Sequence, residues 1–388
     1  MTSFFQRNAT IIAAITALAC CNIAFGLLVQ LVPLSLDARG LPASTIGLNT
    51  AMGQAGVFIT GFSLPFLYSR VQGKQIVLSA IVLLLVAFLA FALLDPVWPW
   101  HVARFACGLA VAALFTTSET WIQTEAGHAR RGRIMGIYMT VLTSTFGVGP
   151  FLISWLGIEG FRPWGAAIAC FVAGLIAMLA IRVNEAAVGE KPAGFLRVLK
   201  QAPMIFVCVG VTTLFEAVML SFIAIFALRH GFTQGGAAQL IGVGIAGCVA
   251  LFYPIGQLSD RWSRSGTVIL CAAVATLGSF ALLPTISSVL VWPLIVLQRA
   301  GAFGVYGVGL TSVGDTFQGA ELVSASALVA ILWGLGGIIG PPAAGKIIDL
   351  YGVDTLPIML GLCYLTVLAG LIITRGRVAP SRTPATAS

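Results

Sequence analysis

The chain has 388 residues, of which 59% are hydrophobic and only 9% are charged. Because soluble globular proteins carry about 25% charged residues, this composition excludes a soluble fold. Apolar windows of about 20 residues, long enough to cross a bilayer, follow one another along the chain, and the alternating pattern of a membrane β-barrel is missing. We therefore expect an all-α membrane protein.

Charge clusters, prolines and glycines divide the first half of the chain into six predicted spans. The N-terminal stretch resembles a signal peptide, but its apolar run continues to Leu36, which is too long for one. We therefore interpret it as the first span. The six spans cover roughly residues 9–36, 44–68, 75–94, 98–124, 133–157 and 163–182.

A polar stretch, "VNEAAVGEKPAGFLRVLKQA" at residues 183–202, separates these spans from six more. We predict an N-terminal six-helix bundle (1–182), a cytoplasmic linker (183–202), and a C-terminal six-helix bundle with a short cytoplasmic tail (203–388). The second set of spans covers roughly residues 203–228, 236–258, 267–284, 288–316, 322–346 and 355–374.

The distribution of basic residues predicts the orientation in the membrane. With both termini cytoplasmic, fifteen of the 21 Lys and Arg residues fall in inside loops or the tail and four fall outside. This bias also explains the net charge of +8, so nothing is left to support nucleic-acid binding. We expect an integral protein of the bacterial cytoplasmic (inner) membrane, with the lipid bilayer as its surroundings.

The two halves of the chain repeat one another. Three landmarks of the first half recur in the second at nearly the same spacing. Such a repeat predicts two pseudo-symmetric bundles of parallel topology, as in many secondary transporters. Arg70 and Arg261 lie 191 residues apart, Pro150 and Pro341 lie 191 apart, and Arg104 and Arg299 lie 195 apart.

These residues lie in motifs that resemble the major facilitator superfamily along the whole chain. "GQLSDRWSR" (256–264) is similar to the family's cytoplasmic loop signature, and its first-half copy has Ser69 where the family has Asp. "RFACG" (104–108) resembles the element of the fourth span. "GIYMTVLTSTFGVGP" (136–150) partly resembles the antiporter motif, with Thr145 in place of a Gly. Within the superfamily, "SETWI" followed by "RRGRIMGIYM" looks most like the YcaD-type transporters.

The resemblance implies a charge network at the cytoplasmic loops that steadies one conformation. In the second half this latch would consist of Asp260, Arg261 and Arg264. In the first half Arg70 would need another acid, and Glu125 is the nearest candidate. The alternative is that these are ordinary loop charges that only satisfy topology.

Gly-Pro pairs in the fifth and eleventh spans remove backbone hydrogen bonds and permit bending. We predict a hinge at Gly149–Pro150 and Gly340–Pro341, with close helix packing as the alternative. The "GVGIAG" stretch (242–247) matches the dinucleotide fingerprint G-x-G-x-x-G, but it lies inside a span without strands around it. We interpret it as a small-residue packing surface.

Ionisable groups well inside the spans fall only on those that the resemblance places around a central cavity. A charged side chain at this depth usually faces water or a partner, because exposure to lipid costs at least ~2.5 kcal/mol. The groups are Arg104 and Glu119 in the fourth span, Glu216 in the seventh, and Arg299 and Asp315 in the tenth.

Depth brings two of these groups together. At about 1.5 Å per residue, Glu216 lies about 20 Å in from the cytoplasmic side and Arg299 roughly 16 Å in from the outside. Both reach the midplane, so they are within range of pairing. A carboxyl group that alternates between wet and dry surroundings loads and releases a proton. We predict proton coupling or substrate binding by Glu216, Arg299, Arg104 and Glu119. The alternatives are a static Glu216–Arg299 pair and, for Glu119, a gate or latch.

We therefore expect a secondary active transporter of a small organic solute, with proton-coupled efflux (antiport) favoured by the antiporter-like motif. Proton-coupled uptake (symport) of a small organic anion and a membrane sensor without transport are the alternatives. No Walker A sequence is present, which excludes an ATP-driven pump. The three histidines are scattered, and the eight cysteines show no metal spacing. We expect no enzyme activity, no cofactor, no metal, a monomer, and a small-molecule substrate and protons as partners.

Overall fold

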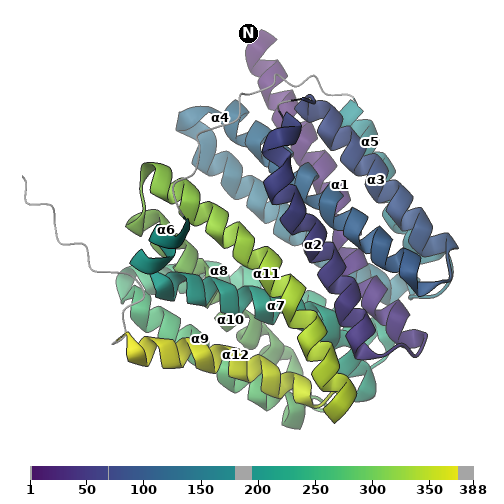
Figure 1. The fold of residues 1–388 in the computed structure, drawn as a ribbon, viewed down its shortest axis with the longest axis vertical. Coiled ribbons are helices and arrows are strands. Elements are labelled where there is room, and N and C mark those ends of the chain that lie inside the picture. Colours follow the sequence, from purple (N-terminus) through teal and green to yellow (C-terminus); the bar gives the residue numbers. More distant parts are fainter. Residues whose placement is uncertain (1, 69, 180–194, 375–388) are drawn as a thin grey trace, which may run out of the picture. The chain divides into compact units, whose positions relative to one another are not determined.

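The computed structural model describes residues 2–68, 70–179 and 195–374, and these are helical nearly throughout (Figure 1). The predictions for residues 183–194, most of the linker, lie outside the described residues. The helices are α1 (Thr2–Ala38), α2 (Ala43–Tyr68), α3 (Gly73–Leu93), α4 (Val97–Leu156), α5 (Arg162–Leu179), α6 (Phe195–Gln201), α7 (Pro203–Arg229), α8 (Gln234–Arg261), α9 (Arg264–Thr285), α10 (Val291–Thr316), α11 (Gly319–Tyr351) and α12 (Thr355–Ile373).

The long helical segment α4 contains two of the predicted spans. The hydroxyl of Tyr138 donates a hydrogen bond of 2.8 Å to Oε1 of Glu119. In one straight helix these residues would lie about 30 Å apart, at about 1.5 Å per residue. The chain therefore reverses direction between them. Its first arm is Val97–Ile122 and its second arm is Ile137–Leu156.

Eleven helical segments are long and apolar enough to cross a membrane, among the residues that the structure describes. The remaining predicted span is α2, which has 26 residues and is therefore about 39 Å long. Its hydropathy is lowered by polar residues such as Asn49 and Gln54. Asn49 is buried, and its side-chain amide donates a hydrogen bond of 3.0 Å to the carbonyl of Trp100 in α4. The polar face of α2 is thus turned toward protein, and the twelve-helix fold is confirmed.

The described residues divide into two compact units. Unit 1 is Met1–Val188 with Phe232–Gly242, and unit 2 is Gly189–Gly231 with Val243–Ser388. The first turns of α8 therefore pack with unit 1 and the rest of α8 with unit 2. The boundaries at residues 182 and 203 stay a prediction.

Unit 1 is built on close helix crossings. α1 packs on α4 and α5, and α2 and α3 pack on α4. A Cβ at Gly149 would collide with the backbone of Gly26 and Leu27, and one at Gly108 with the backbone of Gly53. Only glycine lets these backbones approach so closely.

Unit 2 repeats this arrangement. α7 packs on α10, α11 and α12, and α9 packs on α10 and α12. At the α7–α11 crossing, a Cβ on Gly340 would lie 3.2 Å from the side chains of Leu214 and Val218. This is the counterpart of the α1–α4 crossing, since Gly149 and Gly340 lie 191 residues apart.

Polar bonds between helices repeat as well. In unit 1 the side-chain amide of Asn22 donates a hydrogen bond of 2.6 Å to the carbonyl of Leu142. In unit 2 the hydroxyl of Thr213 donates one of 3.0 Å to the carbonyl of Leu332. Asn22 and Thr213 lie 191 residues apart. The predicted repeat is therefore present in three dimensions as well as in the sequence.

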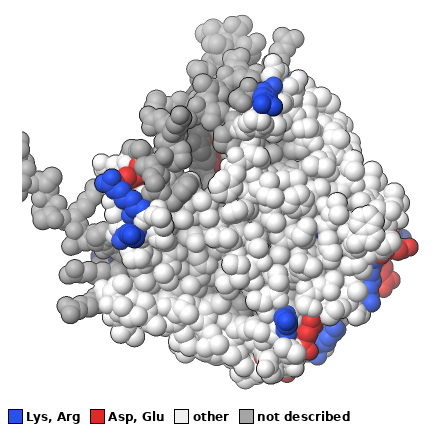
Figure 2. All heavy atoms as spheres, in the orientation of Figure 1, with Lys and Arg blue, Asp and Glu red and all other residues white. Residues whose placement is uncertain are grey.

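Large apolar side chains are exposed on most of the long helices. Soluble proteins rarely expose extended apolar patches, so this surface suits contact with acyl chains. On the face drawn in Figure 2, the described acidic and basic side chains lie near the margins. Examples of exposed apolar residues are Phe62, Val86, Trp155, Ile176, Leu277, Ile339 and Ile372.

Candidate functional site

Glu216 is the central residue of α7 (Pro203–Arg229). This helix is buried on nearly all sides, because α10, α11 and α12 surround it. Only 4% of the Glu216 surface is exposed. The sequence kept a carboxylate in one of the most deeply buried helices of the chain.

Arg299 lies on α10 and is exposed by only 2%. Its aliphatic stem crosses Gly244 of α8, where a Cβ would lie 2.6 Å from the Cδ atom of Arg299. Its guanidinium carbon lies 5.6 Å from the centre of the Phe303 ring, within the range of a cation–π contact. The absence of a side chain at Gly244 leaves room for Arg299. Any larger residue at position 244 would force the arginine stem to shift.

Glu216 and Arg299 form a direct ion pair. Nη2 of Arg299 donates to Oε1 of Glu216 at 2.5 Å. Three further atoms of the pair are buried and have no hydrogen-bond partner: Oε2 of Glu216, and Nε and Nη1 of Arg299. Burying two charges is costly unless their remaining hydrogen-bonding groups are satisfied. The pair thus has no net charge, but its hydrogen-bonding groups are only partly satisfied.

Arg104, in the first arm of α4, is also buried, with 5% of its surface exposed. Its Nε atom lies over α2, 3.1 Å from where a Cβ on Gly53 would be. Nη1 is buried without a hydrogen-bond partner, and no carboxylate among the described residues pairs with this arginine. Unit 1 therefore holds a buried guanidinium that no described carboxylate neutralises.

Glu119 lies near the end of the first arm of α4 and is only partly buried. Its partner is Tyr138, which is fully buried and donates the 2.8 Å hydrogen bond described above. No ion pair to Glu119 is present within the described part of the chain. The structure thus places this carboxyl group with a neutral donor.

The predicted latch residues of the second half lie at the junction of α8 and α9. Arg264, at the start of α9, forms an ion pair with Asp315 in the last turn of α10. Asp315 therefore lies at the half-exposed end of its helix rather than deep inside the span. Asp260 and Arg261 are exposed and form no ion pair with other described residues. The latch role of these residues stays a prediction.

In the first half, the guanidinium of Arg70 lies 4.1 Å from the centre of the Phe66 ring. The side chain of Glu125, its predicted partner, lies outside the described residues. The pairing of Arg70 with Glu125 is therefore untested.

The two Gly-Pro pairs lie inside helical segments. Pro150 is within α4 and Pro341 is within α11, and both glycines, Gly149 and Gly340, face the crossings with α1 and α7. Close packing at these positions is thus observed, and the hinge stays a prediction. The "GVGIAG" stretch is helical, and a Cβ on Gly247 would collide with Val296. Its interpretation as a packing surface is confirmed.

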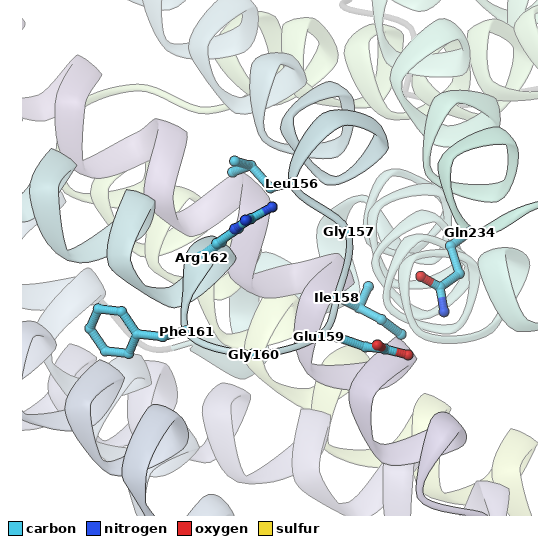
Figure 3. A pocket seen from close by; sticks show the side chains of 8 residues that line it. All are labelled: Leu156, Gly157, Ile158, Glu159, Gly160, Phe161, Arg162 and Gln234. Atoms are coloured by element: carbon cyan, nitrogen blue, oxygen red, sulfur yellow. The ribbon is translucent and has the colours of Figure 1, made fainter.

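A hollow of about 600 Å³ lies in unit 1 over the loop between α4 and α5 (Figure 3). It contains none of the predicted site residues. Its lining is Leu156, Gly157, Ile158, Glu159, Gly160, Phe161, Arg162 and Gln234. Within residues 2–68, 70–179 and 195–374, no cluster of His, Cys, Asp and Glu is suited to hold a metal ion.

Sequence reasoning missed three partners of the site: Tyr138, Gly53 and Gly244. Tyr138 lies in the expected fifth span, and nothing local marks it as a neighbour of Glu119. The two glycines lie 191 residues apart, so the repeat spacing was a signal that linked them to each other, whereas their contacts with the arginines depend on helix packing.

The sequence matches the family model of the Major Facilitator Superfamily over residues 11–312. The chain belongs to this superfamily. Among curated relatives, the uncharacterized transporter YfkF of Bacillus subtilis is 22% identical over 82% of this chain and 84% of its own length. The uncharacterized transporter YcaD of Escherichia fergusonii is 21% identical over 87% of this chain and 89% of its own. The likeness to YcaD-type transporters is thus confirmed.

Solved structures of the superfamily share the fold. A bacterial homologue of the human lysosomal transporter Spinster superposes with a TM-score of 0.82 at 14% identity, over 98% of this chain and 99% of that one. The nucleoside transporter NupG gives a TM-score of 0.78 at 12% identity, over 95% of this chain and 99% of its own. This protein is therefore a membrane transporter of the superfamily by family and by fold.

Proposed function

We propose that this transporter moves a small organic solute by alternating access, coupled to protons and in the direction of efflux. It works as a monomer in the bacterial inner membrane, with both termini cytoplasmic. Its bundles are residues 1–182 and 203–388, joined by a linker at 183–202. The excess of Lys and Arg in the inside loops supports the orientation, and the bacterial relatives support the membrane.

The observation that carries this proposal is the Glu216–Arg299 pair. A static pair kept only for stability would be expected to have its remaining polar atoms satisfied, because a partly satisfied buried network is unfavourable. Here Oε2 of Glu216 and two guanidinium nitrogens of Arg299 have no partner. A pair that opens during the cycle and takes up water or solute accounts for these atoms.

Protonation is the step that opens the pair. A proton on Glu216 removes the charge that holds Arg299, so the arginine is released toward solute or water. Loss of the proton on the other side of the membrane restores the 2.5 Å contact. Cycling between these states links proton movement to the conformational change of the bundle.

The direction of transport rests on the antiporter-like motif at residues 136–150. Gly149 of this motif packs directly on the α1 backbone, a tight crossing that limits leakage between helices. Proton-coupled uptake is the alternative, and the uncompensated Arg104 favours an anionic solute in that case. A membrane sensor without transport is a further alternative.

The test uses purified protein in proteoliposomes with an imposed pH gradient. The solute is first found by comparing solutes accumulated in cells with and without the protein. Wild type should move this solute against its gradient when the pH gradient is present, and Glu216→Gln should lose this coupling. Glu159→Gln, at an exposed loop glutamate, is the matched control and should behave as wild type. Full coupling in Glu216→Gln would refute the role of Glu216, and a wild type without counterflow would refute transport.

A further inference from the structure

We infer that Arg104 binds a carboxylate group of the transported solute. The inference rests on the proposed transport function and specifies its substrate class. It comes from comparing two buried arginines, one in each unit, that lie against equivalent glycines and differ in the presence of a counter-ion among the described residues.

The two arginines lie against equivalent glycines. Arg104 crosses Gly53 of α2, and Arg299 crosses Gly244 of α8. The two glycines lie 191 residues apart, which is the spacing of the repeat. Both arginines are at least nine-tenths buried. Arg104 and Arg299 are 195 residues apart, four more than the repeat spacing, so they approach equivalent glycines from positions about one helical turn apart.

The counter-ion is present in only one unit. Arg299 meets Glu216 at 2.5 Å. The position 191 residues before Glu216 is Phe25, an uncharged side chain whose ring centre lies 6.0 Å from that of Phe146. The anionic partner that unit 2 supplies from its own chain is replaced by a phenylalanine in unit 1.

No other acid of unit 1 takes over this role among the described residues. Glu119 is on the same arm of α4 as Arg104, but fifteen residues further along, which is about 22 Å at 1.5 Å per residue. Its carboxylate is bound by Tyr138 instead. Nη1 of Arg104 is left buried and without a hydrogen bond.

A buried cation without a partner is strongly unfavourable, so the position is explained if a ligand supplies the charge. The planar guanidinium matches a carboxylate, which accepts two parallel N–H bonds from it. A carboxylate of the solute at Arg104 would reproduce in unit 1 the pair that Glu216 and Arg299 make in unit 2. The carboxylate of the solute would then neutralise Arg104 in unit 1, whereas Glu216 already neutralises Arg299 in unit 2.

The experiment uses the solute identified by the accumulation comparison, together with its analogue in which an amide replaces the carboxylate. We expect wild type to discriminate against the amide, and Arg104→Gln to raise KM for the solute by at least about tenfold, the equivalent of one lost charge-assisted hydrogen bond. Arg104→Gln should retain pH-gradient coupling, which Glu216→Gln loses.

The two proposals fail in different ways. A transported solute without a carboxylate, or an unchanged KM in Arg104→Gln, overturns the inference on Arg104 and leaves proton-coupled transport standing. If a pH gradient has no effect on transport by wild type, proton coupling is overturned. The role of Arg104 is then tested by comparing the downhill flux of the solute with that of its amide analogue.

Discussion

In both units a buried arginine lies across a glycine of a neighbouring helix, but among the described residues only the arginine of unit 2 meets a carboxylate. Arg299 has Glu216 at 2.5 Å, whereas Nη1 of Arg104 has no partner. Helix crossings at Gly149 and Gly340, and the interhelical hydrogen bonds of Asn22 and Thr213, recur at the repeat spacing in both units. The repeat has thus kept its packing and differs in its charge.

This difference has a physical cause. A close helix crossing needs a small residue at one fixed position, so a substitution there disturbs the whole bundle. A buried charge needs a compensating partner, which a side chain or a ligand is able to supply. The two units are therefore free to differ in charge while they keep the same helix packing.

The largest expected effect separates the two arginines. Arg299→Gln leaves Glu216 buried without its cation, and should lower the free energy of unfolding by about 3–5 kcal/mol. Arg104→Gln removes a cation that has no partner, and should leave stability unchanged or raise it. Chemical or thermal unfolding in detergent measures both. The double variant Glu216→Gln/Arg299→Gln should recover most of the loss, and equal losses for the two arginine variants would break the comparison.

The next effect concerns the helix crossings. Gly149→Ala places a Cβ in collision with the backbone nitrogen of Leu27 in α1. Gly340→Ala is less crowded, because the nearest atoms to its Cβ are side-chain atoms of Leu214 and Val218 at 3.2 Å and the carbonyl oxygen of Leu214 at 3.3 Å. We expect Gly149→Ala to cost about 1–3 kcal/mol and Gly340→Ala clearly less, as measured by unfolding. Gly61→Ala is the control, because nothing lies within 4 Å of its Cβ. A larger loss at Gly340 would contradict the packing described for unit 1.

A smaller effect compares two buried tyrosines. Tyr138 donates to the carboxylate of Glu119 at 2.8 Å, and Tyr364 donates to the hydroxyl of Thr212 at 3.2 Å. Hydrogen bonds to charged groups are worth about 1.5–3 kcal/mol and neutral ones about 1 kcal/mol. Tyr138→Phe should therefore destabilise more than Tyr364→Phe at a pH where Glu119 is ionised. Equal losses would show that Glu119 is neutral or that its hydrogen bond is weak.

The smallest effect on stability is expected at the Arg264–Asp315 ion pair of unit 2. The Arg264–Asp315 pair is partly exposed, so Asp315→Asn should change the free energy of unfolding by no more than about 1 kcal/mol. It should nevertheless slow transport, because the pair ties the start of α9 to the end of α10. We expect Asp260→Asn to slow transport too, through the predicted latch. Turnover in proteoliposomes measures both variants, and unchanged rates in both would remove the latch.

The sequence by itself determined the class of protein, the number of spans and the repeat. These follow from hydropathy and spacing, which are local or one-dimensional properties: a run such as α7 is apolar whatever surrounds it, and the 191-residue spacing needs no coordinates. Depth along a helix is also local, which is why the midplane positions of Glu216 and Arg299 were predicted.

Only the tertiary structure decided which side chains meet. One residue along a helix rotates a side chain by about 100°, so the phase of each helix, set by packing, determines whether two groups at the same depth face each other. Helix packing brings three pairs of side chains into contact: Glu216 with Arg299, Glu119 with Tyr138, and Arg264 with Asp315. The same packing places Arg104 against Gly53, where no described carboxylate pairs with it. Spacing and hydropathy predict how deep a charge lies, whereas its partner depends on contacts between residues that are distant in the sequence.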